Sequence, residues 1–409
     1  MPILLPVLDL KPGMCVAKHI EYNCRYLLPG GHFLTGDDIT NLQEKIPGRM
    51  IYIFDPLLDE VVDFYNDSYD EGACYQVRGY LTKILQKVDG LIQSQVSLSA
   101  ENLAGMEHTV RDLVHFLVDN PAVLAVLKQS KSWDSFMQEH SASVFYLSML
   151  IGNTLQNYLR GGRETGPGIS LAPLAAASFL HDLGMISIEE LYKKNGPLTD
   201  EEKQMIREHP ENGASMLPSS IDPLIRQIVR QHHENQDGSG YPEGRKGKEM
   251  HFFARIIRVA DAFCAATAQK RYQRAKSPLQ ALHEMVFGTY RRFYDPIILK
   301  IFASFLQPFP IGAKLKLGNG QQAIVTHHNP KNPFAPEIIV AFDSNGFPIG
   351  RGSLETPFYL GERSDITVQS FGEEDLSYIN HMPDQEKLSA EEEKETKRYF
   401  TEMFDLVYP

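Results

Sequence analysis

The stretch Leu174–Gly184 reads Leu-Ala-Ala-Ala-Ser-Phe-Leu-His-Asp-Leu-Gly and sets an adjacent histidine and aspartate, His181 and Asp182, behind an apolar run. The run predicts a buried helix whose inner face leads through Leu174 and Ala177 to His181. An adjacent imidazole and carboxylate can serve two metal ions, the carboxylate bridging both while the imidazole binds one of them. The stretch therefore favours a mainly helical fold that carries metal-binding groups at a helix end.

Two more histidines lie at similar places. His140 continues an apolar stripe with helical spacing, which predicts that its side chain points inward. The stripe consists of Val144, Leu147, Ile151, Leu155 and Tyr158. Thr199 and Glu202 form a capping-box pattern that begins another helix, and His209 lies on the inner face of that helix. Pro210 is expected to break this helix directly after the histidine.

A histidine pair and a second aspartate complete the set. Asp222 and Pro223 predict a helix start with an N-cap and a proline at the first position, and this helix ends in His232 and His233. Asp261 lies at the inner edge of an apolar helix, where an unpaired charge would be costly to bury. The sequence therefore directs five histidines and two aspartates toward one helical core.

A lone inward histidine is usually a hydrogen-bonded core residue, and this alternative holds for each histidine taken singly. Together, the seven side chains would form an expensive, half-satisfied polar network without a metal. Nitrogen and oxygen ligands without thiolates suit iron, manganese or catalytic zinc. Two ions about 3.5–4 Å apart can clamp a phosphoryl group from both sides. The pattern thus predicts a two-metal phosphohydrolase.

Five motifs, taken in order, resemble the HD phosphohydrolase superfamily and its HD-GYP subgroup over residues 131 to about 308. They are Glu139-His140-Ser141, His181-Asp182-Leu183-Gly184, His209-Pro210-Glu211-Asn212-Gly213, the thirteen residues His232–Gly244 (HHENQDGSGYPEG) and Ala254–Asp261 (ARIIRVAD). The thirteen-residue signature is long and ordered, which makes a chance match remote. The HD-GYP proteins that this chain resembles are bacterial phosphodiesterases that open cyclic di-GMP.

The resemblance implies an all-helical catalytic domain that hydrolyses a 3′-5′ phosphodiester by a metal-bridged hydroxide. His181 and Asp182 are the implied catalytic residues. The implied metal ligands are His140, His181, Asp182, His209, His232, His233 and Asp261. The expected substrate contacts are Asp237, Gly240, Tyr241, Lys270, Arg271 and Arg274. We expect the glycines of this loop to allow close approach of a ligand and Tyr241 to stack on a guanine. The alternative is a rigid loop that merely closes the domain.

Two departures from the family pattern bear on the activity. Family members usually carry Lys, which reaches the scissile phosphate, where this chain has Met185. Loss of such a donor can cost about 10²–10³ in rate, so a weak or inactive cyclic di-GMP sensor is an alternative. A Glu that supplies a third metal in some members is Phe136 here. We therefore expect two ions, of which iron and manganese are the favoured identities. By the resemblance, a two-metal site implies pGpG as the main product. Another cyclic dinucleotide such as cyclic GMP-AMP is a further alternative substrate.

The helical domain is expected between two smaller modules. A β-rich module resembles one often fused to this subgroup, and a small β-barrel-like module follows the catalytic domain. The expected boundaries are 1–72 for the β-rich module, 73–130 for a helical connector, 131–310 for the HD-GYP domain, 311–372 for the β-barrel-like module and 373–409 for an acidic, partly helical tail.

Composition limits the partners. The formal net charge of −12, from 40 basic and 52 acidic residues, argues against a nucleic-acid polymer or an anionic membrane. Residues 241–300 nevertheless hold 12 basic and 5 acidic residues, and this local positive charge can attract an anionic dinucleotide. No run approaches the ~20 apolar residues of a membrane span. The four cysteines have no CxxC spacing, which favours the cytoplasm. A homodimer and a protein partner, held by the Gly-Tyr-Pro loop or the N-terminal module, are further expectations.

Overall fold

The computed structural model describes residues 2–22, 25–54, 135–160, 170–192, 194, 196–268, 275–306, 308–329 and 332–381. The chain divides into two compact units, one made of residues 1–70 and 303–385 and the other of residues 71–302 and 386–409. The expected connector at 73–130, most of the expected tail and the side chains of Lys270, Arg271 and Arg274 lie outside the described residues.

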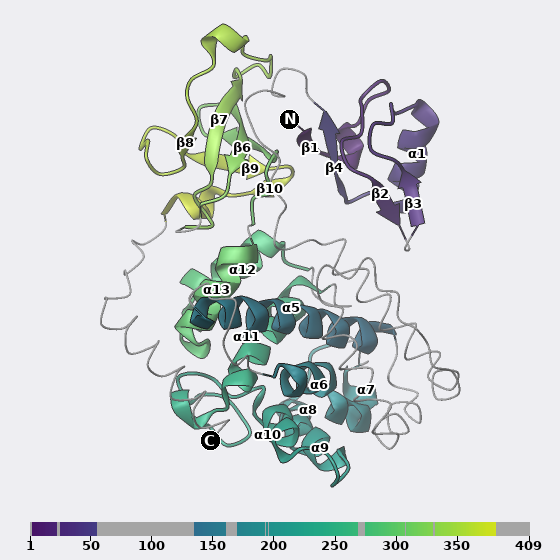
Figure 1. Cartoon of the computed structure of the whole chain (residues 1–409), viewed down its shortest axis with the longest axis vertical. Helices are drawn as coiled ribbons and strands as arrows, with labels where there is room; N and C mark the ends of the chain where they lie inside the picture. The colour runs from purple at the N-terminus through teal and green to yellow at the C-terminus, as the bar shows by residue number, and fades with distance from the viewer. Residues whose placement is uncertain are drawn as a thin grey trace. The chain divides into compact units, whose positions relative to one another are not determined.

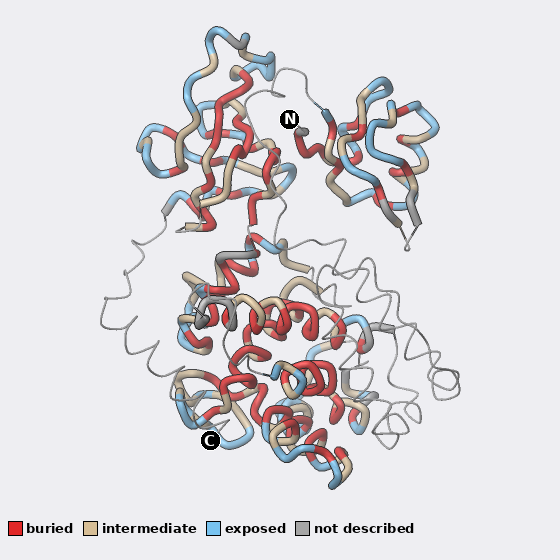
Figure 2. The backbone as a smooth tube through the Cα atoms, viewed as in Figure 1, coloured by how far each residue is buried: buried red, intermediate tan, exposed pale blue. Residues whose placement is uncertain are grey.

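The second unit is helical where it is described, as the sequence predicts (Figure 1). The helices from Ser135 onward are α5 (Ser135–Arg160), α6 (Ala172–Leu180), α7 (Glu189–Tyr192), α8 (Asp200–Arg207), α9 (His209–Met216), α10 (Pro223–Gln231), α11 (Phe252–Thr267), α12 (Pro278–Phe287) and α13 (Pro296–Leu306). Helix α5 packs against both α6 and α11, and α10 packs against α6 and α9. Buried residues are concentrated along α5, α6 and α11 (Figure 2). These packed helices position the ends that carry the histidines.

The predicted helix starts are present, with one change of boundary. Thr199 and Glu202 form the expected capping box at the start of α8. The Asp222 carboxylate accepts a hydrogen bond from the Leu224 N–H at the start of α10. However, α8 ends at Arg207, and His209 begins α9 instead of ending the helix before the proline. Proline is tolerated in the first turn of a helix, where its missing N–H costs no bond, so Pro210 opens a helix here.

The start of α11 links the histidine pair to the helix that carries Asp261. The His251 N–H donates to the side-chain oxygen of Gln231, the last residue of α10. The His251 ring nitrogen Nδ1 accepts a hydrogen bond from the Phe253 N–H and so caps α11. Burial and the nearby Arg255 lower the pKa of His251 from its ordinary 6.5 to about 4. The cap is therefore neutral at physiological pH.

This cap predicts a loss of stability in mild acid. The unfolded chain takes up a proton on His251 below pH 6.5, whereas the folded chain does so only near pH 4. The free energy of unfolding therefore falls as the pH drops from 6.5 to 4, by about 3 kcal/mol from this residue. His251→Asn keeps a capping oxygen but cannot titrate, so the variant should lose correspondingly less stability over that range. Helix unfolding in urea, followed at several pH values, measures the difference. Equal pH dependence in the two proteins would contradict this role.

The first unit is β-rich. Strand β1 (Pro2–Pro6) pairs antiparallel with β4 (Met50–Phe54), and β2 (Ile20–Tyr22) pairs with β3 (Arg25–Leu28). Helix α1 (Gly36–Lys45) begins after its N-cap, Thr35. The remaining strands form one antiparallel sheet in the order β10-β9-β5-β6-β7-β8. Their bounds are β5 (Lys314–Leu317), β6 (Gln322–His327), β7 (Glu337–Phe342), β8 (Phe358–Tyr359), β9 (Val368–Phe371) and β10 (Glu374–Asp375). Strands β8 and β10 are the edges of this sheet, so the described strands form an open sheet instead of the expected barrel.

The two β-rich segments share one core, although the sequence analysis treats them as separate modules. The Leu4 N–H donates to the Gly312 carbonyl oxygen at 2.8 Å, and Leu4 pairs with Ala313. Ile3 and Ile324 belong to the same cluster of buried apolar side chains. Small modules bury limited apolar surface alone, and a shared core enlarges the buried surface of both.

Among the helices that the structure describes, none has the length and apolar character to cross a bilayer.

Candidate metal centre

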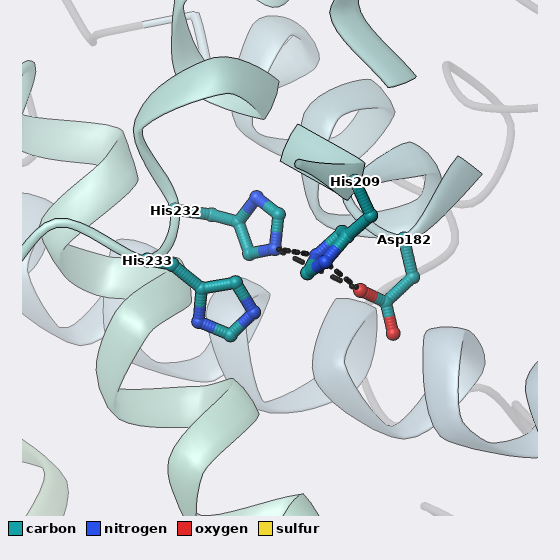
Figure 3. A group of neighbouring side chains, drawn as sticks. All are labelled: Asp182, His209, His232 and His233. Atoms are coloured by element: carbon teal, nitrogen blue, oxygen red, sulfur yellow. Dashed lines mark hydrogen bonds and ion pairs between the residues drawn. The ribbon is translucent and has the colours of Figure 1, made fainter. Parts of the chain in front are cut away.

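The predicted histidines and aspartates come together in the helical unit, and Figure 3 shows the group around His209. One group contains Asp182, His209, His232 and His233, and a second contains His140, His181 and Asp182. Within each group, one ligand atom from every residue lies within 4.8 Å of the others. His181, His209 and His232 lie at helix boundaries, whereas His140 is within α5 and Asp261 within α11. Asp182 is common to both groups.

Three of the histidines are oriented in the same way by the backbone. His181, His209 and His232 each have Nδ1 close to the carbonyl oxygen three residues earlier, at 2.8, 2.7 and 2.6 Å respectively. Only an N–H can donate to a carbonyl oxygen, so the proton of each neutral ring is on Nδ1. The Nε2 atom of each ring then carries a lone pair. Such a backbone contact fixes the tautomer of metal-binding histidines.

The Nε2 lone pairs converge without proton donors between them. Nε2 of His209 lies 3.1 Å from Nε2 of His232. Nε2 of His181 is buried and has no hydrogen-bond partner among the described residues. Burial lowers the pKa of His181 to about 4 and that of His233 well below its ordinary value, so these two rings are uncharged at neutral pH. Lone pairs that converge in this way fit a bound cation, so the donor set suits metal ions.

The two oxygens of Asp182 face different histidine pairs. Oδ1 lies 3.2 Å from Nε2 of His209 and 3.7 Å from Nε2 of His232. Oδ2 lies 3.5 Å from Nε2 of His181 and 3.7 Å from Nε2 of His140. Burial acts to raise the pKa of Asp182, but the neighbouring histidines hold it well below its usual range. The ionised carboxylate therefore lies between the two groups of donors.

Asp261 adds a second carboxylate on the side of His140. Its Oδ1 lies 3.1 Å from Nε2 of His140, and its Oδ2 lies 3.9 Å from Nδ1 of His233. Burial again acts to raise the pKa of Asp261, and the hydrogen bond from His140 with the nearby histidines holds it far below its usual range. All seven side chains that the sequence analysis singles out as ligands thus line one buried centre.

Two glycines allow backbone segments to approach this centre closely. A Cβ atom on Gly184 would lie 2.0 Å from the His209 carbonyl oxygen and 2.7 Å from the Gly213 nitrogen. A Cβ atom on Gly240 would lie 2.3 Å from the Asn235 nitrogen. The close approach at Gly240 is therefore to the chain's own backbone, and the expected contact of this glycine with a ligand stays a prediction.

The Gly-Tyr-Pro loop is fixed to the centre by side chains on both sides. The Tyr241 ring stacks on His233, with the ring centroids 4.8 Å apart, so one face of the ring covers a histidine. The buried Glu234 carboxylate accepts hydrogen bonds from the Glu243 and Arg245 N–H groups at 2.7 and 2.9 Å. Asp237 accepts a hydrogen bond from the Ser239 N–H. This role of Glu234 is not among the predictions from the sequence, although an acidic residue beside two histidines is itself a signal.

Two arginines lie near the centre, and the expected cations Lys270, Arg271 and Arg274 are outside the described residues. Met185, where the family pattern has Lys, is half-buried and its N–H donates to the Asp182 carbonyl oxygen at 2.9 Å. Arg258, three residues before Asp261 and on the same side of α11, donates from Nε to Asn235 at 2.9 Å. The Arg207 guanidinium lies 5.7 Å from the centroid of the Tyr241 ring. Neither arginine was singled out, yet the helical spacing from Asp261 could have indicated Arg258.

Residues 165–298 match the family model described as HD domain. This segment, about a third of the chain, is similar to an HD domain. The match includes six of the seven side chains of the centre and excludes His140, which α5 contributes from outside.

The chain is also similar to several curated proteins. It is 28% identical over 228 residues to a cyclic di-GMP phosphodiesterase of Pseudomonas aeruginosa, covering 55% of this chain and 52% of that one. It is 26% identical over 302 residues to a cyclic di-GMP phosphodiesterase of Thermotoga maritima, covering 68% of this chain and 76% of the other. A 3′3′-cGAMP-specific phosphodiesterase of Vibrio cholerae is 32% identical over 126 residues, 30% of this chain and 24% of that protein. The chain thus spans about half the length of the Pseudomonas relative.

Proposed function

We propose that this protein is a metal-dependent phosphodiesterase that hydrolyses a 3′-5′ phosphodiester of cyclic di-GMP, with linear pGpG as the main product. The observation that carries the proposal is the position of Asp182, whose two oxygens face two different histidine pairs. A carboxylate in that position suits a pair of cations, and paired cations suit phosphoryl transfer. The similarity to phosphodiesterases of cyclic dinucleotides supports this reaction class.

Two divalent ions, iron or manganese, fit the oxygen and nitrogen donors. His209, His232 and His233 would hold one ion with Asp182, and His140, His181 and Asp261 would hold the other with the same carboxylate. When bound, such ions act as Lewis acids toward a phosphoryl oxygen and lower the pKa of a coordinated water.

The chain's own residues prepare this site in three ways. The backbone carbonyls hold the Nδ1 protons and so turn the Nε2 lone pairs inward. The low pKa values of Asp182 and Asp261 keep both carboxylates ionised at physiological pH. Close backbone packing at Gly184 keeps the segment that carries Asp182 against the segment that carries His209. Because these groups are positioned before the substrate arrives, little reorganisation is required during the reaction.

Met185→Lys is expected to raise the turnover of cyclic di-GMP about tenfold or more. The variant places a cation at the position from which, by the family resemblance, a lysine reaches the scissile phosphate, and one such donor can contribute about 10²–10³ in rate. Steady-state rates of both proteins at equal metal content measure the effect. Met185→Gln, which adds a polar group without a charge, is the matched control. Equal rates in the lysine variant and the wild type would show that position 185 does not limit the reaction.

Two alternatives each rest on one observation. Met185 removes a donor and favours a sensor that binds cyclic di-GMP without turning it over. The similarity to the Vibrio cholerae protein favours 3′3′-cGAMP as the substrate. Parallel measurements of affinity and turnover with both dinucleotides separate the three functions. We expect a higher kcat/KM for cyclic di-GMP. Tight binding without turnover would favour the sensor. A higher kcat/KM for 3′3′-cGAMP would make that dinucleotide, instead of cyclic di-GMP, the substrate.

A further inference from the structure

Arg258 lies on α11 one turn before Asp261, and two contacts hold its side chain. Its Nε donates to the Asn235 side-chain oxygen at 2.9 Å, and Asn235 follows His233 by two residues. Its guanidinium lies 5.3 Å from the centroid of the Tyr294 ring, a distance typical of a cation–π contact. A planar guanidinium held on one edge and one face is already oriented, so less freedom is lost when it binds a ligand.

The two contacts leave the outer edge of this guanidinium available. The terminal nitrogens Nη1 and Nη2 form no hydrogen bond with the described residues, and no described carboxylate pairs with Arg258. By contrast, Arg255, one turn earlier on α11, donates to the buried Asp295 carboxylate at 2.7 Å. A half-buried arginine without an acidic partner leaves a positive charge uncompensated. Two terminal N–H groups in a fixed fork match two oxygens of a phosphate.

A second arginine, Arg207, lies near Tyr241 of the Gly-Tyr-Pro loop. Its guanidinium is 5.7 Å from the centroid of the Tyr241 ring, and its side chain is exposed. No described carboxylate pairs with Arg207 either. Arg207 and Arg258 both act to lower the pKa of the Tyr241 hydroxyl, whereas burial and both carboxylates of the centre raise it. The tyrosine thus lies within the electrostatic reach of both arginines and of Asp182 and Asp261.

We propose that Arg258 binds a phosphate of the dinucleotide through Nη1 and Nη2, that Arg207 assists from the side of Tyr241, and that this arginine pair supplies the positive charge absent at Met185. This inference rests on the proposed function for the identity of the substrate. The anion site itself rests on the arginine contacts and on the absence of a described acidic partner.

The experiment compares binding to the metal-loaded full chain in three proteins: wild type, Arg258→Gln and the control Lys203→Gln. Lys203 is an exposed cation on α8 with an acidic partner, Asp200, and lies outside the centre. Calorimetry gives the dissociation constants of cyclic di-GMP, inorganic phosphate and guanosine. We expect Arg258→Gln to weaken cyclic di-GMP binding about 10–100-fold and to weaken phosphate binding, with guanosine binding and metal content unchanged. Lys203→Gln should match the wild type for all three probes.

A variant that carries both Arg258→Gln and Met185→Lys tests whether Arg258 takes the place of the missing lysine. Met185→Lys should restore most of the dinucleotide affinity that Arg258→Gln removes, because it returns a cation to the same phosphate. Arg258→Lys should retain part of the affinity, since it keeps the charge but lacks the guanidinium fork. Failure of Met185→Lys to restore any affinity would overturn the replacement of the missing lysine by Arg258.

The outcomes separate this inference from the proposed function. Equal affinity of wild type and Arg258→Gln for phosphate would overturn the anion site. Equal losses of guanosine binding, phosphate binding and metal content in Arg258→Gln would also overturn it, because they indicate that Arg258 only supports the loop. If the wild-type protein neither binds nor hydrolyses cyclic di-GMP, the proposed function fails, and a weaker phosphate affinity in Arg258→Gln would still support the anion site.

Discussion

Asp182→Ala is expected to lose at least one metal ion per chain and to lower the turnover of cyclic di-GMP by about 10³-fold or more. The reason is that the two oxygens of Asp182 lie between both groups of donors, so one substitution affects both proposed metal sites. Loss of a single transition-state donor costs about 10²–10³ in rate, and loss of a shared ligand should cost at least as much. Elemental analysis and steady-state rates on anaerobically purified protein measure both effects.

Asp200→Ala is the matched control for Asp182→Ala. Asp200 is an exposed aspartate at the start of α8 and pairs with Lys203 on the surface. Surface ion pairs contribute little to stability, so the control should retain its metal and its rate within about twofold. Full metal content and full turnover in Asp182→Ala would refute the assignment of this carboxylate to the metal centre.

Gly184→Ala is expected to destabilise the helical unit by about 3 kcal/mol or more and to remove most of the turnover. The added Cβ atom would lie 2.0 Å from the His209 carbonyl oxygen, which no side-chain rotation can relieve because the neighbour is backbone. Separation of the two segments would move Asp182 away from His209, whose Nε2 is now 3.2 Å from Oδ1. Overpacking typically costs 1–3 kcal/mol and occasionally more.

Gly36→Ala provides the comparison for Gly184→Ala. Gly36 is the first residue of α1, and a Cβ atom added there meets nothing within 4 Å. We therefore expect a neutral or slightly stabilising effect from this substitution. Urea unfolding monitored by circular dichroism, together with metal content, distinguishes the two variants. If Gly184→Ala unfolds at the wild-type midpoint with full metal content, the backbone approach is not required for the site.

The sequence could indicate most of the centre because its ligands lie within helices or at helix ends that local patterns mark. Apolar spacing placed His140 inside α5, and the cap at Asp222 with Pro223 predicted the helix that leads to His232 and His233. Such local features depend on neighbouring residues alone, so they can be read without tertiary contacts. The thirteen-residue loop signature then indicated the reaction class through family resemblance.

The remaining features depend on contacts between distant residues. The approach of Gly184 to His209 joins segments 25 residues apart and leaves no local pattern. The contacts that orient Arg258 come from Asn235 and Tyr294, which are distant from it in the sequence. The common core of the two β-rich segments joins Leu4 to Gly312, which are separated by the whole helical unit in sequence. The sequence also could not show that one face of Tyr241 is already covered by His233, which leaves less of the ring for a guanine.

The most direct test of the central claim is the conversion of cyclic di-GMP to pGpG by the full chain purified without oxygen. The protein is assayed as purified, after removal of metal by a chelator, and after reloading with iron or manganese. We predict that turnover is lost on chelation, returns on reloading and saturates at about two ions per chain. Absence of turnover with every metal, in protein that still binds cyclic di-GMP, would contradict the claim that this chain is a phosphodiesterase.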